Sequence, residues 1–135
     1  ARYLECPVII CHKSREKANV VRSITAIGDV KGKNVIIVDD MIDTAGTLAK
    51  AANVLKDMGA LSVRACATHP VLSGPAYDRI AESALEEVIV SDTIPLSSDP
   101  AKDKSKITVL TMTDIFASII DKVYNYEPIS TSFIN

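Results

Sequence analysis

Short apolar runs alternate with segments of helical periodicity along the chain, and this pattern predicts alternating strands and helices. The runs are rich in β-branched residues, which suit a pleated sheet. An apolar run of four to eight residues between turn signals is typical of a buried strand. Five runs fit this description, at residues 7–11, 35–38, 62–68, 87–90 and 107–110.

Three segments place apolar residues at helical spacing, and each predicts a helix with one inward face. The first begins near Thr47 and ends at Gly59, because glycine readily adopts the left-handed conformation that ends helices. The second follows Gly74-Pro75, and the third is expected to be capped by Thr113. The inward residues are expected to be Leu48, Ala51, Ala52, Leu55 and Met58, then Tyr77, Ile80, Ala81 and Ala84, and finally Phe116, Ile119, Ile120 and Val123.

Two polar stretches interrupt this alternation. His12 to Asp29 is charged and lacks a clean period, so we expect a long loop, with room for a strand within 18–26. Ser91 to Lys106 reads as a long polar connection. Strands and helices in this order predict an α/β fold with a mostly parallel sheet and flanking helices. In such sheets ligands bind beyond the carboxyl ends of the strands.

Length, charge and cysteine content narrow the function classes. The chain has 135 residues, which suits one domain, and its net charge is −2. That balance argues against a general nucleic-acid binder. Cys6, Cys11 and Cys66 are odd in number, so free thiols in a reducing cytoplasm are the simplest interpretation. No apolar run approaches the roughly 20 residues that a membrane span needs, and no membrane association is expected.

The most polar cluster follows the run at 35–38 and reads Asp39-Asp40-Met41-Ile42-Asp43-Thr44-Ala45-Gly46-Thr47. Two adjacent carboxylates repel each other, and a hard cation such as Mg²⁺ or a sugar diol would offset that cost. The next five residues are mostly small and lead into a helix, whose first N–H groups attract anions. A plain strand-to-helix turn capped by Asp43 or Thr44 is the alternative. The whole string favours a sugar-phosphate site.

This string resembles the phosphoribosyl-diphosphate motif of type I phosphoribosyltransferase folds. The version from Met41 to Thr47 is similar to that of the ribose-phosphate diphosphokinases in particular. Three further stretches of the chain resemble that family, namely Lys13-Ser14-Arg15-Glu16-Lys17-Ala18-Asn19, Thr68-His69-Pro70-Val71-Leu72-Ser73-Gly74-Pro75-Ala76 and Thr93-Ile94-Pro95-Leu96.

The resemblance implies transfer of the diphosphoryl group of Mg-ATP to the 1-hydroxyl of ribose 5-phosphate. It implies that Asp39 and Asp40 hold the ribose hydroxyls and help to place Mg²⁺. Asp43, Thr44, Ala45, Gly46 and Thr47 would surround the 5-phosphate, and Lys13 and Arg15 would act from a mobile catalytic loop. A cytoplasmic homo-oligomer with ATP and ribose 5-phosphate as partners is implied for the full-length parent.

The chain also departs from the family pattern. Ser14 stands where a second arginine is usual. In the tail, Ser130 matches part of a regulatory phosphate site, but Pro128 replaces a serine. Residues 1–135 would form an incomplete C-terminal phosphoribosyltransferase-like domain, truncated on its N-terminal side. The resemblance implies that the N-terminal domain and the diphosphate loop are absent, so the chain alone is expected to be inactive.

Two other functions fit parts of the sequence. A nucleobase phosphoribosyltransferase shares the acidic loop but needs a base-binding hood. A non-catalytic regulatory relative of the kinase usually loses the loop cations or the acidic pair, and this chain keeps Lys13, Arg15, Asp39 and Asp40. His69 precedes a proline at a strand end, and we expect a hydrogen-bonded structural histidine there. No Cys/His spacing indicates zinc.

Overall fold

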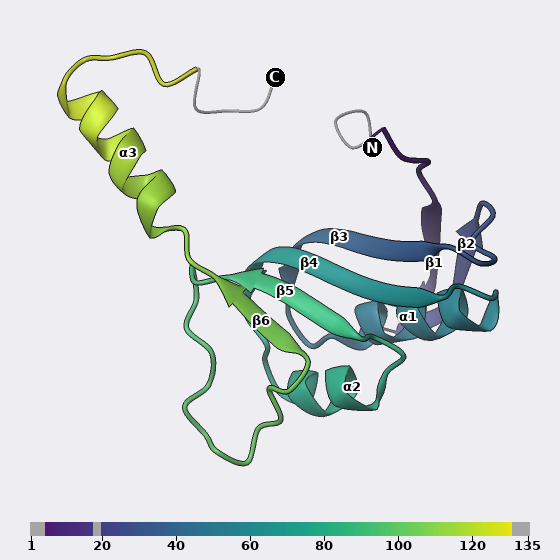
Figure 1. The fold of residues 1–135 in the computed structure, drawn as a ribbon. Coiled ribbons are helices and arrows are strands. Elements are labelled where there is room, and N and C mark those ends of the chain that lie inside the picture. Colours follow the sequence, from purple (N-terminus) through teal and green to yellow (C-terminus); the bar gives the residue numbers. More distant parts are fainter. Residues whose placement is uncertain (1–4, 18–19, 131–135) are drawn as a thin grey trace.

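The computed structural model of the chain describes residues 5–17 and 20–130. Its centre is a four-stranded sheet in which every neighbouring pair of strands is parallel. The strands lie side by side in the order in which they occur in the chain (Figure 1). They are β3 (Asn34–Ile42), β4 (Ser62–Pro70), β5 (Glu87–Ser91) and β6 (Ile107–Leu110). The α/β class and the parallel sheet are therefore confirmed.

Two helices cover one face of this sheet (Figure 1), namely α1 (Gly46–Asp57) and α2 (Ala76–Glu82). The core lies between them and the strands, because alternate residues of β4 and β5 point to that face. The largest fully buried side chains include Leu55 of α1 and Ile80 of α2. The predicted inward faces of these two helices are confirmed at Leu48, Ala51, Ala52, Leu55, Tyr77 and Ile80. The prediction is wrong for Met58, which is the C-cap of α1 and is exposed.

The opposite face of the sheet is left uncovered in the described part of the chain. Val35 of β3 is buried, whereas Ile36 and Val38 on the same strand are 61% and 74% exposed. The prediction of a fully buried strand at 35–38 is therefore correct for one face only. Apolar character on both faces of a strand indicates that both suit burial, but the described helices cover only one of them.

The segment that we expected to be a long loop, with room for a strand within 18–26, contains a pair of strands, and the second of them agrees with the strand allowed there. β1 (Ile10–Lys17) and β2 (Val20–Ile27) pair antiparallel, with Ile10 opposite Ile27, in a sheet of their own. The predicted buried strand at 7–11 is also wrong, because Val8, Ile10 and Cys11 are exposed. Cross-strand pairing stabilised strands that the aperiodic pattern did not reveal.

The last helix, α3 (Thr113–Tyr124), extends away from the sheet (Figure 1). None of its residues is buried, and Phe116, Ile120 and Val123 are all more than half exposed. The prediction that this face points inward is wrong for the structure as it stands. The helix period was identified correctly, but periodicity does not specify the surface against which a face packs. The N-cap is Met112, one residue before the expected Thr113.

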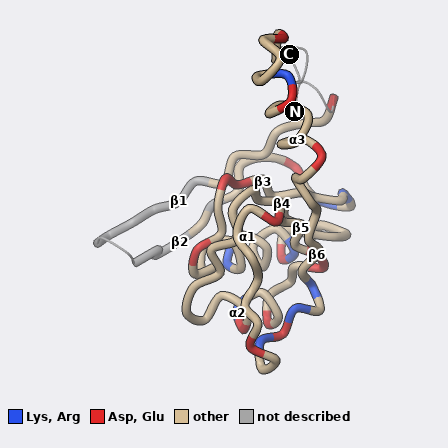
Figure 2. The backbone as a smooth tube through the Cα atoms, turned by 90° about the vertical axis from the view of Figure 1, so that its left-hand side faces the viewer, with Lys and Arg blue, Asp and Glu red and all other residues tan. Residues whose placement is uncertain are grey.

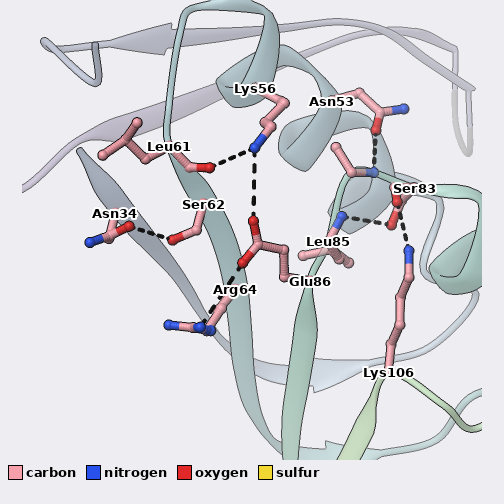
Figure 3. A network of polar contacts seen from close by, with 11 residues as sticks. Asn34, Asn53, Lys56, Leu61, Ser62, Arg64, Ser83, Leu85, Glu86 and Lys106 are labelled. Atoms are coloured by element: carbon pink, nitrogen blue, oxygen red, sulfur yellow. Dashed lines mark hydrogen bonds and ion pairs between the residues drawn. The ribbon is translucent and has the colours of Figure 1, made fainter. Parts of the chain in front are cut away.

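A network of polar contacts fixes the end of the sheet at which the strands begin (Figure 3). Glu86 lies 3.8 Å from Lys56 Nζ and 4.0 Å from Arg64 Nη2, while Asn34 accepts a 2.7 Å hydrogen bond from Ser62. Lys106 Nζ donates to three carbonyl oxygens at the end of α2, among them that of Ala81 at 2.7 Å. The opposite end of the sheet, where the strands finish, remains open for a site.

Charged residues of both signs are mixed along the backbone, and they alternate in the connection between β5 and β6 (Figure 2). No helix in the described ranges combines the length and the apolar character that crossing a bilayer would require.

Candidate functional site

A cleft of about 940 Å³ opens at the carboxyl end of β3. Its wall is formed by the end of β3, the turn that follows and the first turns of α1, with one side chain from α2. The carboxyl end of a parallel strand is where α/β sheets bind ligands. The structure therefore brings together all seven residues that the sequence assigned to a sugar phosphate, which are Asp39, Asp40, Asp43, Thr44, Ala45, Gly46 and Thr47.

Asp39 and Asp40 lie within β3 and are both exposed. Each carboxylate accepts a hydrogen bond from the next backbone N–H, at 3.0 Å from Asp40 and 2.8 Å from Met41. The regular alternation of the strand also breaks here. Val35 and Ile42 are seven residues apart, which would place them on opposite faces of a regular strand, yet both are buried. The acidic pair therefore occupies an irregular strand end that opens to the cleft.

The turn into α1 starts the helix without a side-chain cap. Ala45 is the N-cap residue and adopts the left-handed conformation, with φ 56° and ψ 4°. The helical ladder begins with Ala49 N–H donating to Ala45 O, so the N–H groups of Gly46, Thr47 and Leu48 precede it. No side chain caps this end. The expectation in the alternative that Asp43 or Thr44 caps the helix is therefore wrong.

The connection between β4 and α2 holds this turn from the side. Ser73 Oγ donates a very short hydrogen bond to Asp43 Oδ1, and Ser73 N–H donates to Asp43 O at 3.1 Å. Leu72 N–H donates to Ile42 O at 2.9 Å, which continues the pairing of β3 with β4 beyond the strand ends. Arg79 Nη1 donates to Thr44 O at 2.9 Å. Residues from two elements thus fix the loop from 42 to 44.

Sequence analysis did not identify Arg79 as a residue of this cleft. Lys50 and Asn53 of α1 also line it and were equally missed. Lys50 and Asn53 follow Gly46 and Thr47 by whole helical turns, so helical spacing could have found them. Nothing in the sequence around Arg79 indicates that α2 packs beside α1 with this side chain directed at residue 44.

The remaining predicted residues lie outside this cleft or outside the described side chains. The backbone of Lys13 and Arg15 lies in β1, opposite Ile24 and Val21, and their side chains are not among those described. Ser130 is exposed and follows α3. Their assigned roles therefore stay predictions.

His69 has the structural partner that the sequence favoured. It lies at the end of β4, beside Met41 of β3, and its Nδ1 is 3.0 Å from Thr93 Oγ1. Within residues 5–17 and 20–130 there is no group of three or more His, Cys, Asp or Glu side chains that could hold a metal ion. Cys6, Cys11 and Cys66 are free thiols, as expected.

The fold and this cleft together define an α/β domain with acidic and anion-attracting groups at one strand end. A family model, the phosphoribosyl synthetase-associated domain, matches residues 4–134. The chain belongs to this family.

The similar proteins agree with one another. The chain is 52% identical over 138 residues to a ribose-phosphate pyrophosphokinase of Wolinella succinogenes and 51% identical over 134 residues to one of Campylobacter jejuni. Among solved structures, the phosphoribosylpyrophosphate synthetase of Mycobacterium smegmatis is similar, with a TM-score of 0.78 and 43% identity over 89% of this chain.

The matched regions are only part of each relative. Each of the two curated matches includes 99% of this chain. The chain, however, spans only 43% and 42% of the length of those two proteins, and 37% of the length of the solved structure. Family membership is therefore shown for residues 4–134, which correspond to less than half of each of these relatives.

Proposed function

We propose that this chain forms the ribose 5-phosphate half of a ribose-phosphate diphosphokinase site. The complete enzyme would transfer the diphosphoryl group of Mg-ATP to the 1-hydroxyl of ribose 5-phosphate, giving phosphoribosyl diphosphate and AMP. One observation supports this most strongly. Two exposed carboxylates, Asp39 and Asp40, and an uncapped helix N-terminus share one cleft. A diol beside a phosphate is the ligand that such a cleft suits.

Each end of the substrate has its own set of residues in this proposal. The carboxylates of Asp39 and Asp40 accept hydrogen bonds from ribose hydroxyls. The backbone N–H groups from Gly46 onward, with the hydroxyls of Thr44 and Thr47, donate to the 5-phosphate. A phosphate at a helix N-terminus is stabilised both by these donors and by the helix dipole.

Magnesium fits the acidic end of the cleft. Mg²⁺ prefers oxygen ligands and usually binds proteins through one or two carboxylates together with substrate phosphates. Asp39 and Asp40 provide two such groups, which are exposed and adjacent. A bound Mg²⁺ would neutralise phosphate charge as it develops during transfer.

Lys13 and Arg15 are the proposed catalytic cations. They would donate to the phosphates of ATP, whose developing charge cationic side chains stabilise. The rest of the proposal concerns the complete protein, which we expect to be a cytoplasmic homo-oligomer. Residues 1–135 would form part of its C-terminal phosphoribosyltransferase-like domain, and Ser130 would contribute to a regulatory phosphate site.

The names of the curated relatives favour diphosphoryl transfer over transfer to a nucleobase. Eight of the curated relatives carry the name ribose-phosphate pyrophosphokinase. A regulatory, non-catalytic role has less support, because the acidic pair is retained and lines the cleft.

A titration of the isotope-labelled chain with ribose 5-phosphate tests the site directly. We expect amide shifts at residues 43–47, together with competition by sulfate. Ribose without a phosphate is the matched control and should leave these amides unshifted. Gly46→Val should abolish the shifts, because its Cβ would lie 3.1 Å from Arg79 Nη1 and the branched side chain would crowd this part of the cleft. A folded sample whose residues 43–47 do not respond to millimolar ribose 5-phosphate would contradict the assignment.

A further inference from the structure

Arg79 of α2 reaches the loop from Asp43 to Thr47, which we call the phosphate loop after its proposed function. The proposed function assigns no role to Arg79. It extends from α2, lines the cleft and donates from Nη1 to Thr44 O at 2.9 Å. We propose that Arg79 is a positioning residue, which fixes the peptide between Thr44 and Ala45 so that the following N–H groups face the substrate phosphate. This inference rests on the proposed function of the cleft.

The peptide that Arg79 contacts precedes the strained residue of the turn. Ala45 has a positive φ of 56°, a conformation that residues with a Cβ rarely adopt. Rotation of the preceding peptide is the direct way to release this strain. That rotation would exchange the positions of the Thr44 carbonyl and the Ala45 N–H. Strained backbone conformations persist only where the surrounding structure imposes them. The hydrogen bond from Arg79 to Thr44 O holds the peptide in the orientation that the strained residue requires.

The charge of Arg79 strengthens this restraint. A hydrogen bond from a guanidinium to a carbonyl oxygen is stronger than one between neutral groups. It also requires the carbonyl to remain directed at Arg79. A carbonyl turned toward the cleft instead would present partial negative charge to an anion, whereas adjoining N–H groups in a turn attract one. The hydrogen bond from Arg79 therefore disfavours the orientation in which the Thr44 carbonyl faces the cleft. It favours the orientation in which the N–H groups face the cleft.

The position of the guanidinium explains a glycine at residue 46. Gly46 is helical and has no positive φ, so its backbone angles do not require glycine. A Cβ added there would lie 3.1 Å from Arg79 Nη1 and 3.7 Å from its Cζ. The 3.1 Å distance is tighter than an ordinary contact, so a methyl group would shift the guanidinium by a few tenths of an ångström, away from its present place beside residue 44. Glycine therefore makes room for Arg79 beside the loop.

Arg79 is itself well anchored. Its neighbours Tyr77 and Ile80 are buried in the core, which fixes α2 relative to the sheet. The residues before α2 are bonded to the loop, through Ser73 to Asp43 and through Leu72 to Ile42. A side chain on such a base can hold a peptide orientation, because its own backbone does not move with the loop.

Three variants of the 135-residue chain test this role by titration with ribose 5-phosphate. Arg79→Met removes the charge and the donor but keeps most of the length, and Arg79→Lys keeps a cation. Arg64→Met is the matched control, because Arg64 is also a partly exposed arginine but lies in the network at the other end of the sheet (Figure 3).

We expect Arg79→Met to bind ribose 5-phosphate about ten-fold more weakly, as expected from loss of one charge-assisted hydrogen bond. Arg79→Lys should recover part of that loss, and Arg64→Met should bind like the wild type. The amide signals of Ala45 and Gly46 should change in free Arg79→Met, whereas a merely structural role for Arg79 would leave them in place. Thermal melting confirms that each variant is folded.

Gly46→Ala provides a second and independent variant. Its methyl group should displace the guanidinium and weaken binding in the wild type, but add little further loss to Arg79→Met, since the two changes affect one contact. If the wild type binds and Arg79→Met binds equally well, the role of Arg79 is refuted while the site stands. Fully additive losses would also refute it. If the wild type does not bind, the proposed site fails and this inference fails with it.

Discussion

At the scale of single residues, the acidic pair at the end of β3 has a proposed role in ligand binding but contributes little to the stability of the fold. Asp39 and Asp40 are exposed, so their charges remain in contact with water and add little to the folded state. Their mutual repulsion is weakly unfavourable for folding. Residues with these properties are better explained by a ligand than by the fold.

Replacing both aspartates with asparagine should therefore leave the free energy of unfolding unchanged or slightly higher. The same double variant should lose binding of ribose 5-phosphate, since asparagine provides neither the charge nor the second acceptor oxygen. Denaturant unfolding and amide titration measure the two effects on one sample. Glu82→Gln, an exposed acidic residue of α2, is the control for loss of charge. An unfolded double variant, or one with normal binding, would refute the assignment.

Asp92 provides a pH prediction at the same scale. Hydrogen bonds from the Thr111 hydroxyl and the Met112 N–H hold the pKa of this exposed carboxyl below its ordinary value of 3.8. A lowered pKa stabilises the folded state above pH 3.8, and this contribution is lost as the pH falls through the folded pKa. In Asp92→Asn the free energy of unfolding should therefore decrease less between pH 6 and pH 3. Equal decreases in both proteins would contradict this.

At the scale of elements, the parallel strands and α1 followed from sequence because their patterns report local preference and burial together. Gly59 ends α1 with φ 94°, as its position predicted. The hairpin of β1 and β2 and the exposed face of α3 did not follow. Pairing between strands and the surface that covers a face are properties of the assembled molecule, and the local pattern does not contain them. The left-handed Ala45 and the reach of Arg79 were hidden for the same reason.

The contrast between α1 and α3 can be measured. Leu55→Ala in α1 should lower the free energy of unfolding by about 2–5 kcal/mol, because it leaves a cavity in the core. Phe116→Ala in α3 should change it by about 0.5 kcal/mol or less, as surface substitutions do. Urea unfolding of the two variants beside the wild type gives both numbers. A loss at Phe116 comparable with that at Leu55 would mean that the apolar face of α3 is packed in solution.

At the scale of the whole molecule, the share of each relative that the chain spans limits what it can do alone. The chain covers 43% of the Wolinella succinogenes protein. Chemistry depends on binding energy from every part of the substrates, including parts distant from the reacting atoms.

The 135-residue chain alone should therefore form no AMP from ATP and ribose 5-phosphate. A longer protein containing it should do so with Mg²⁺ present, and the same assay with EDTA is its control. Turnover by the isolated chain close to that of the longer protein would show that the cleft needs no other domain.

The order of the strands also has a consequence for how the molecule folds. Within the parallel sheet, β4, β5 and β6 each pair with the strand that precedes them in the chain. Contacts between neighbours in sequence cost little loop-closure entropy, so the sheet can grow by one strand at a time as the chain lengthens. The loop from Asp43 to Thr47 is present once β3, α1 and β4 have assembled, but Arg79 joins it only when α2 docks. The peptide at residue 44 is then among the last parts of the site to reach its final orientation.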